Sequence, residues 1–244
     1  MNNKKKALQE FYNHNIENWE HFPRSEVRQQ YLNLLNYQVR TRLSILDVGC
    51  GTGIDSQIIS ERLRTLNIEG YEALGIDFCD RAIELGNNKT ISGDISKEWR
   101  FEVEDLFEFH TPKFFNIVLC SMVIMQYENI EVFFEKLSSF LDHKGQLLVV
   151  TNNPYLVSME YSIAYINENS YDHIFEIEPE KKQITIRKYH HSLNRYFEAA
   201  KKTHLFLESY KEIYAYNNET SMFNSAEKNT YGYPNFIALH FIKR

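Results

Sequence analysis

Cysteine is scarce in this chain, and Cys50, Cys79 and Cys120 are too few, and odd in number, for a disulfide framework. Such sparse use of cysteine is typical of a reduced, intracellular protein. Long apolar runs are also missing. The longest, 117–125, is interrupted by Ser121 and is far shorter than the roughly 20 residues of a membrane-spanning helix. Because the N-terminus reads Met-Asn-Asn-Lys-Lys-Lys and lacks the apolar stretch of a secretory signal, we expect a soluble cytoplasmic protein without a membrane partner.

Positive charge is in deficit, with 27 Lys and Arg residues against 33 Asp and Glu residues and a formal net charge of −6. This balance argues against a protein that binds long nucleic acids, because the phosphate backbone is bound through a positive surface. The nine histidines and three cysteines form no His-x-x-x-His or Cys-x-x-Cys pair. We therefore expect neither a nucleic-acid partner nor a metal site.

Glycine is rare as well, with 9 residues in a chain of 244. Three of them, Gly49, Gly51 and Gly53, lie within five positions. A chain that is poor in glycine and concentrates it so tightly needs unusual backbone conformations there. The cluster directly follows the apolar segment 43–48, so it lies at the end of a predicted strand.

Short apolar segments alternate with segments of helical spacing in the middle of the chain. This alternation predicts an α/β fold with a parallel sheet covered by helices on both faces. The predicted strands are 43–48, 73–77, 101–103, 114–120 and 145–151, and the predicted helices between them are 54–66, 80–85 and 130–141. Two amphipathic helices are predicted before the first strand, in residues 1–42.

The alternation stops after residue 151 and resumes near Ser192. The intervening residues 152–191 are rich in tyrosine, and 174–177 with 184–187 suggest a hairpin. Because about 40 residues make a poor core alone, we expect an insertion over the sheet. The predicted parts are N-terminal helices (1–42), an α/β core (43–151), an insertion (152–191), and a final section (192–244). In the final section, Ser192 would cap a helix, with strands at 205–216 and 235–242.

Residues 45–53, Ile-Leu-Asp-Val-Gly-Cys-Gly-Thr-Gly, form a strand and a glycine loop that lead into a helix. Such a loop lets the backbone approach a ligand closely. The dinucleotide fingerprint G-x-G-x-x-G fails in both possible registers, because its third glycine falls on Ile54 or on Ser56. The phosphate-binding pattern G-x-x-x-x-G-K-[ST] is also absent.

The loop instead resembles the D/E-x-G-x-G-x-G signature of class I S-adenosylmethionine-dependent methyltransferases. The resemblance covers roughly residues 40–151 and 189–244. It implies a Rossmann-like, doubly wound sheet of seven strands, mostly parallel with an antiparallel last strand around 235–242. It also implies S-adenosyl-L-methionine as the cofactor and S-adenosyl-L-homocysteine as the product.

The resemblance also implies a set of cofactor contacts. The loop would pass under the methionine part, Asp77 would hold the ribose diol, and Asp105 would lie by the adenine, with Glu104 as the alternative. The other implied cofactor residues are Tyr12, which would close over the methionine carboxylate, Asp47, Gly49, Cys50, Gly51 and Gly53 of the loop, Leu106, and Cys120 with Ser121, whose backbone would meet the cofactor. Two purely structural alternatives stay open: Asp77 could cap the next helix, and Tyr12 could pack in the core without touching the cofactor.

Residues 189–193, Tyr-His-His-Ser-Leu, resemble a stretch of small-molecule methyltransferases that precedes the last helix. His190 is a candidate general base, since imidazole titrates near neutral pH; the alternative is a histidine that only caps or packs. We expect methyl transfer to an oxygen or nitrogen atom of a small molecule, with 152–191 and the N-terminal helix as a substrate lid. The alternatives are a methyltransferase acting on tRNA or protein and a non-catalytic regulator that binds the cofactor. The oligomeric state is left open.

Overall fold

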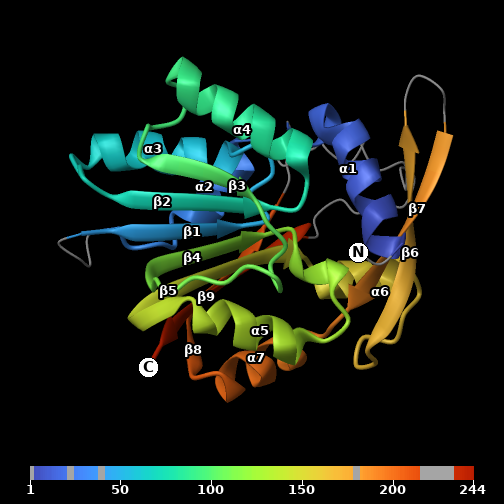
Figure 1. Ribbon diagram of the computed structural model, residues 1–244. Coiled ribbons are helices and arrows are strands. Elements are labelled where there is room, and N and C mark those ends of the chain that lie inside the picture. Colours follow the sequence, from blue (N-terminus) through green and yellow to red (C-terminus); the bar gives the residue numbers. More distant parts are fainter. Residues whose placement is uncertain (1–2, 21–24, 38–41, 178–181, 215–233) are drawn as a thin grey trace.

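The computed structural model describes residues 3–20, 25–37, 42–177, 182–214 and 234–244. Its centre is a seven-stranded sheet with the strand order β3-β2-β1-β4-β5-β9-β8 (Figure 1). The strands are β1 (Ser44–Val48), β2 (Glu72–Asp77), β3 (Trp99–Val103), β4 (Phe115–Ser121), β5 (Leu141–Asn152), β8 (Leu205–Ile213) and β9 (Phe236–Lys243).

Strand direction follows the predicted pattern. Strands β3, β2, β1, β4 and β5 pair in parallel, whereas β9 is antiparallel to both β5 and β8. Six strands therefore share one direction, and β9, the last strand in the chain, runs against them. This confirms the predicted doubly wound, Rossmann-like sheet with its antiparallel last strand.

Helices cover both faces of the sheet (Figure 1). One face packs against α2 (Ser25–Leu32), α3 (Ile54–Thr65) and α4 (Asp80–Ser92), and the other against α5 (Ile130–Ser139) and α7 (Leu193–Lys202). Alternation along β1 shows why: Ile45 joins the first cluster and Leu46 the second. A strand that is apolar on both sides has to be buried on both sides.

The N-terminal helix α1 (Asn3–Glu20) lies against α4. Gln9 Nε2 donates a hydrogen bond to the carbonyl of Phe78 at 2.7 Å, and Asn13 Nδ2 donates to Asp80 Oδ1. These contacts place α1 beside the loop that follows β2. No helix in the described ranges is long and apolar enough to cross a bilayer.

The insertion contains one helix and a separate two-stranded sheet. Helix α6 (Pro154–Glu160) follows β5 directly, and β6 (Asn169–Ile177) pairs antiparallel with β7 (Lys182–His190). The short 3-10 helix η1 (Ile124–Gln126) contacts β7. In Figure 1 the hairpin and α6 stand at the end of the sheet toward which β1, β2 and β4 point.

Several element boundaries differ from the sequence prediction. The hairpin strands are about twice as long as predicted, helix α6 was not predicted, and β8 ends at Ile213, while predicted Tyr216 lies outside the described residues. Ser192 is at the N-cap of α7, as predicted, but its side chain makes no capping hydrogen bond. Cross-strand pairing extends β6 and β7 through polar residues that the apolar pattern does not mark.

Candidate active site

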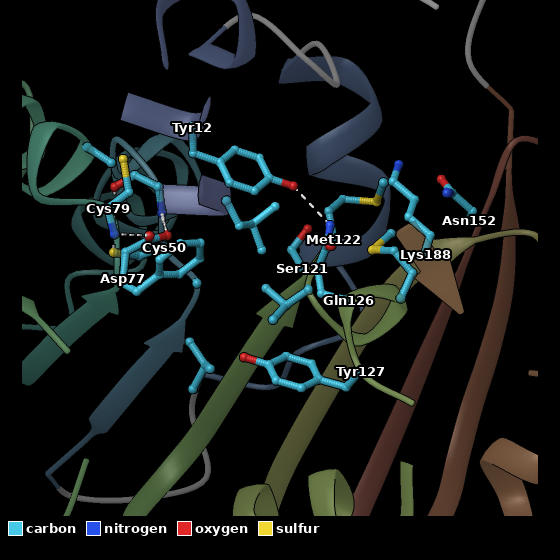
Figure 2. Close-up of a pocket in the computed structure, with 18 of the residues that line it drawn as sticks. Tyr12, Cys50, Asp77, Cys79, Ser121, Met122, Gln126, Tyr127, Asn152 and Lys188 are labelled. Carbon is cyan, nitrogen blue, oxygen red and sulfur yellow. Dashed lines mark hydrogen bonds between the residues drawn. The ribbon is translucent and has the colours of Figure 1, made fainter. Parts of the chain in front are cut away.

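A cavity of about 640 Å³ opens at the edge of the sheet where the parallel strands end (Figure 2). Val48, Asp77, Ser121 and Asn152, the last residues of β1, β2, β4 and β5, all line it. The strand order reverses between β1 and β4, and ligands of open α/β sheets bind at such a switch point. The insertion supplies the opposite wall.

The glycine loop forms the floor of the cavity next to β1. Gly49 and Cys50 both donate backbone hydrogen bonds to the carbonyl of Ile76, at 2.8 and 3.1 Å. Gly49, Gly51 and Gly53 have φ angles of 69°, 54° and 78°, in the left-handed region that favours glycine. A Cβ atom at Gly49 would also collide with the side chain of Val123. Gly49, Cys50 and Gly51 line the cavity, whereas Gly53 is the N-cap residue of α3 and is not part of the wall.

Asp77 links the loop to the start of α4. Its Oδ2 accepts a hydrogen bond from the Gly51 backbone at 2.9 Å, and its Oδ1 accepts one from the Cys79 backbone at 2.9 Å. Burial raises the pKa of Asp77, and these backbone donors oppose the shift. The N-cap of α4 is Cys79, so Asp77 is not the cap residue itself. The carboxyl group lines the cavity and keeps acceptor positions for a ligand.

Asp47 does not reach the cavity. It is buried under the glycine loop, where its Oδ2 accepts a hydrogen bond from Ser56 Oγ at 3.1 Å. Burial, then the charge of Asp55, raises its pKa. Cys120 is also fully buried and is not a lining residue, while the next residue, Ser121, is. Asp47 and Cys120 therefore stand behind the wall that their neighbours form.

The acids after β3 lie together on the wall. Glu104, Asp105 and Leu106 all line the cavity, and Asp105 Oδ1 accepts a hydrogen bond from the Phe107 backbone at 2.9 Å. The backbone N–H of Glu104 donates a hydrogen bond to the carbonyl oxygen of Asp77 at 3.0 Å. This bond ties the loop after β3 to the end of β2. Because Glu104 and Asp105 both line the cavity, the choice between them stays open.

Tyr12 reaches over the cavity from α1 (Figure 2). Gln126 Nε2 donates a hydrogen bond to its hydroxyl oxygen at 2.9 Å, and its ring contacts Phe78 edge-on, with centroids 5.9 Å apart. Burial, then the charge of Asp77, raises the pKa of the phenol. Tyr12 therefore joins α1 to the segment after β4 across the mouth of the site.

A buried ion pair between Arg28 and Asp55 was missed by the sequence analysis. Arg28 Nη1 lies 2.9 Å from Asp55 Oδ1, and the Tyr31 hydroxyl donates to the same carboxylate at 2.7 Å. Both Arg28 and Asp55 line the cavity. The sequence offered one signal, Asp55 itself, an acid two residues after the last loop glycine. Nothing in the sequence pairs Asp55 with Arg28, which lies 27 positions earlier.

The insertion contributes a second group of lining residues, of which the sequence pointed to Tyr161 and His173 as substrate-facing candidates. They are Leu156, Val157, Glu160, Tyr161, Tyr171, His173 and Lys188. The Tyr161 hydroxyl is hydrogen-bonded to His173 Nδ1. Burial, then the charge of Lys188, lowers the pKa of His173 to about 3, so the imidazole is neutral at pH 7. Burial lowers the pKa of Lys188 to about 8, and Glu160 opposes that shift.

His190, the predicted general base, lies outside this cavity. It is 2 % exposed, and its Nε2 is 3.0 Å from the carbonyl oxygen of Tyr165. Burial lowers its pKa. The placement corresponds to the packing alternative, and the catalytic assignment stays a prediction that this geometry does not support. Among the residues that the structure describes, no group of three or more His, Cys, Asp or Glu residues is arranged to hold a metal ion.

A family model described as "Methyltransferase domain" matches residues 40–220. The chain belongs to this methyltransferase domain family. The match begins just before β1 and runs through the core, the insertion and α7. The glycine loop and the insertion wall thus lie within the matched residues, whereas Tyr12, Arg28 and Phe236 of the cavity wall lie outside them.

Individual relatives are distant. A ubiquinone biosynthesis O-methyltransferase of Rickettsia felis is 24 % identical over 151 residues, which are 59 % of this chain and 58 % of that relative. The magnesium protoporphyrin IX methyltransferase of Synechocystis, solved with bound S-adenosyl-L-homocysteine, has a TM-score of 0.65 at 13 % identity and covers 99 % of this chain and 100 % of its own. The N-methyltransferase NodS of Bradyrhizobium japonicum, in complex with the same compound, has a TM-score of 0.64 at 12 % identity, covering 99 % of both chains. These solved structures share the fold of this methyltransferase domain.

Proposed function

We propose that the protein transfers a methyl group from S-adenosyl-L-methionine to an oxygen or nitrogen atom of a small-molecule acceptor. One observation carries the proposal: a single cavity joins the glycine loop and Asp77 at one end to the insertion wall at the other. A cofactor and an acceptor can therefore lie end to end in it. The names of the relatives, which include O- and N-methyltransferases, support the same reaction class.

The residues at the loop end fit this cofactor. We propose that Asp77 accepts hydrogen bonds from the ribose hydroxyls, since a carboxylate suits a diol. Glu104 or Asp105, with Leu106, would hold the adenine, and Ser121 would meet the cofactor through its backbone. Gly49, Cys50 and Gly51 would lie along the methionine part. Asp47, Gly53 and Cys120 would act indirectly, by shaping the loop and the end of β4.

Arg28 and Tyr12 suit the charged end of the methionine part. Arg28 is a cation on the cavity wall, paired with Asp55, whose carboxylate also accepts a hydrogen bond from the Tyr31 hydroxyl. We propose that its guanidinium group faces the cofactor carboxylate, with Tyr12 closing over it. The bound cofactor supplies an activated methyl group, so the protein mainly has to hold the donor and acceptor in line. Such orientation can contribute up to roughly 7–11 kcal/mol.

We propose a small molecule as the acceptor and α6 with the β6–β7 hairpin as the lid that shields it. The insertion contributes Tyr161 and Tyr171 to a cavity of about 640 Å³, within the usual size of a small-molecule site. The net charge of −6 supports this acceptor over tRNA. The three buried free cysteines support a reaction in the reducing cytoplasm.

Calorimetry with S-adenosyl-L-methionine, S-adenosyl-L-homocysteine and NAD tests the proposal. We expect both sulfur compounds to bind and NAD neither to bind nor to compete. Tight NAD binding without a response to either sulfur compound would refute the proposal. Cofactor binding without methylation of any acceptor in a broad panel of phenols, acids and amines would instead favour the non-catalytic regulator.

A further inference from the structure

The segment Tyr-His-His-Ser-Leu at 189–193 holds a second histidine that the proposed function does not use. His191 lies between the end of β7 and Ser192, the N-cap residue of α7. Its side chain is 2 % exposed and is not part of the wall of the large cavity. Buried polar groups are nearly always hydrogen-bonded, so the partners of the two ring nitrogens show what this histidine does.

The Nε2 atom of His191 reaches the segment that follows β4. It lies 3.0 Å from the carbonyl oxygen of Tyr127, the residue that ends η1. Because a carbonyl oxygen can only accept, Nε2 carries the proton and is the donor of this hydrogen bond. Gln126 and Tyr127 both line the cavity. His191 therefore joins the start of α7 to the back of the cavity wall.

The other side of the His191 ring is fixed by the insertion and by α7. Nδ1 lies 3.4 Å from Glu168 Oε1, and the ring of Tyr196 contacts the imidazole edge-on, with centroids 6.0 Å apart. Arg195 fixes Glu168 in turn, because its Nε is 2.5 Å from Glu168 Oε1 and its Nη2 is 2.6 Å from Glu131 Oε1. An imidazole enclosed in this way has little freedom to move, so the carbonyl group that it binds is fixed as well.

Tyr127 presents its side chain to the cofactor end of the cavity. In Figure 2 its ring extends across the lower part of the cavity, with the hydroxyl group on the side where Asp77 lies. The ring packs against Phe107 and Phe133, with centroids 5.2 and 5.0 Å away. Burial, then the charge of Asp105, raises the pKa of the hydroxyl group, so it is protonated at pH 7 and can donate. A ligand bound against Asp77 and Asp105 would meet this hydroxyl group.

We propose that His191 is a positioning residue of the cofactor site. Its hydrogen bond to the Tyr127 carbonyl fixes the Tyr127 side chain, whose hydroxyl group forms a hydrogen bond with the adenosine part of the cofactor. His191 itself does not touch the cofactor and acts through Tyr127. This inference rests on the proposed function, because that function assigns the adenosine part to Asp77 and to the acids after β3.

Two ligands separate the adenosine part from the rest of the cofactor. S-adenosyl-L-homocysteine carries the adenosine and the amino acid, whereas 5′-methylthioadenosine carries the adenosine alone. Tyr127→Phe should weaken the binding of both by the same factor, about three- to tenfold, as expected for one hydrogen bond between neutral groups. Calorimetry measures both affinities. Unchanged affinities, or a loss for S-adenosyl-L-homocysteine alone, would overturn the contact with adenosine.

A double-mutant cycle tests the positioning role. His191→Leu alone should weaken binding of S-adenosyl-L-homocysteine about as much as Tyr127→Phe does, because the hydroxyl group is no longer held in place. In the Tyr127→Phe background the same change should cost little more, since the group that His191 positions is already gone. His191→Gln should restore most of the affinity, because its amide group can donate to the same carbonyl oxygen.

His190→Leu is the matched control. His190 is the neighbouring residue and is equally buried, at 2 % exposure. Its Nε2 contacts the carbonyl oxygen of Tyr165, which is not part of the cavity wall. Its loss should leave both ligand affinities unchanged. Thermal unfolding checks that each variant is folded; should His191→Leu not fold, His191→Asn, with its shorter side chain, takes its place in the cycle.

Two results would overturn the positioning role. One is an unchanged affinity for S-adenosyl-L-homocysteine in a folded His191→Leu protein. The other is a pair of losses that simply add in the double variant, which would make the effect of His191 independent of the Tyr127 hydroxyl group. Failure of the proposed function is separate, because it appears as a wild type that does not bind S-adenosyl-L-homocysteine at all.

Discussion

At the level of single residues, Asp77 both braces the backbone around it and faces the cavity. Its carboxylate braces the glycine loop through Gly51 and the start of α4 through Cys79, and it also lines the cavity. A ribose diol bound there would meet an acceptor that is already fixed in position. Preorganisation of this kind reduces the entropy lost on binding.

Asp77→Asn should therefore weaken binding of S-adenosyl-L-homocysteine by about 2–3 kcal/mol, because it removes a charge while keeping the shape of the side chain. Calorimetry measures the change directly. Glu102→Gln is the control, since Glu102 is an exposed acid on neighbouring β3 and does not line the cavity. Unchanged affinity in a folded Asp77→Asn protein would leave Asp77 with only its bracing role.

At the scale of the element, two asparagines begin helices in different surroundings. Asn153 Oδ1 accepts a hydrogen bond from the Tyr155 backbone at 3.0 Å, and its Nδ2 donates to the carbonyl of Pro234 at 3.0 Å. Asn129 Oδ1 accepts one from the Val132 backbone at 3.1 Å, at the exposed start of α5. Asn153 thus fastens α6 to the segment before β9, whereas Asn129 acts within its own helix.

Asn153→Ala should lower the free energy of unfolding by roughly 2 kcal/mol or more, since the loss of a cap adds to a buried carbonyl without its donor. Asn129→Ala should cost about 1 kcal/mol, the usual value for a lost cap. Urea denaturation of both variants gives the comparison. Equal losses would show that the bond to Pro234 contributes little to anchoring the insertion.

At the scale of the whole molecule, the cavity lies between the sheet edge and the insertion, so its two ends belong to different parts of the fold (Figures 1 and 2). The loop end is built from β1, β2 and the residues after β3. The far end is built from α6, the β6–β7 hairpin and the start of β9. Ligands at the two ends should therefore protect different backbone amides from hydrogen exchange.

Amide hydrogen exchange with and without each ligand measures this protection. S-adenosyl-L-homocysteine alone should slow exchange in residues 49–53, 77–79 and 104–106, because a ligand protects the segments whose opening it prevents. Adding a small-molecule acceptor that binds should extend the protection to residues 154–160 and 169–173. Protection of the insertion by the cofactor product alone, with no further change on adding the acceptor, would contradict this division of the cavity.

Local sequence patterns are sufficient to predict the core of this protein. The alternation of buried strands with helices specified the parallel sheet, and the cluster of Gly49, Gly51 and Gly53 marked its left-handed loop. Asp77 could be placed at a strand end because it directly follows an apolar run. These are local properties, since strand period and positive φ depend on a few neighbouring residues.

Which side chains share the cavity depends on long-range contacts that local patterns do not predict. Lys188 and His190 lie on the same face of β7, two residues and about 6–7 Å apart, yet Lys188 lines the cavity and His190 packs against the Tyr165 carbonyl. The Arg28–Asp55 pair likewise joins two helices that are separated in the chain. Sequence patterns do not encode such contacts, because they arise when strand pairing and burial bring distant segments together.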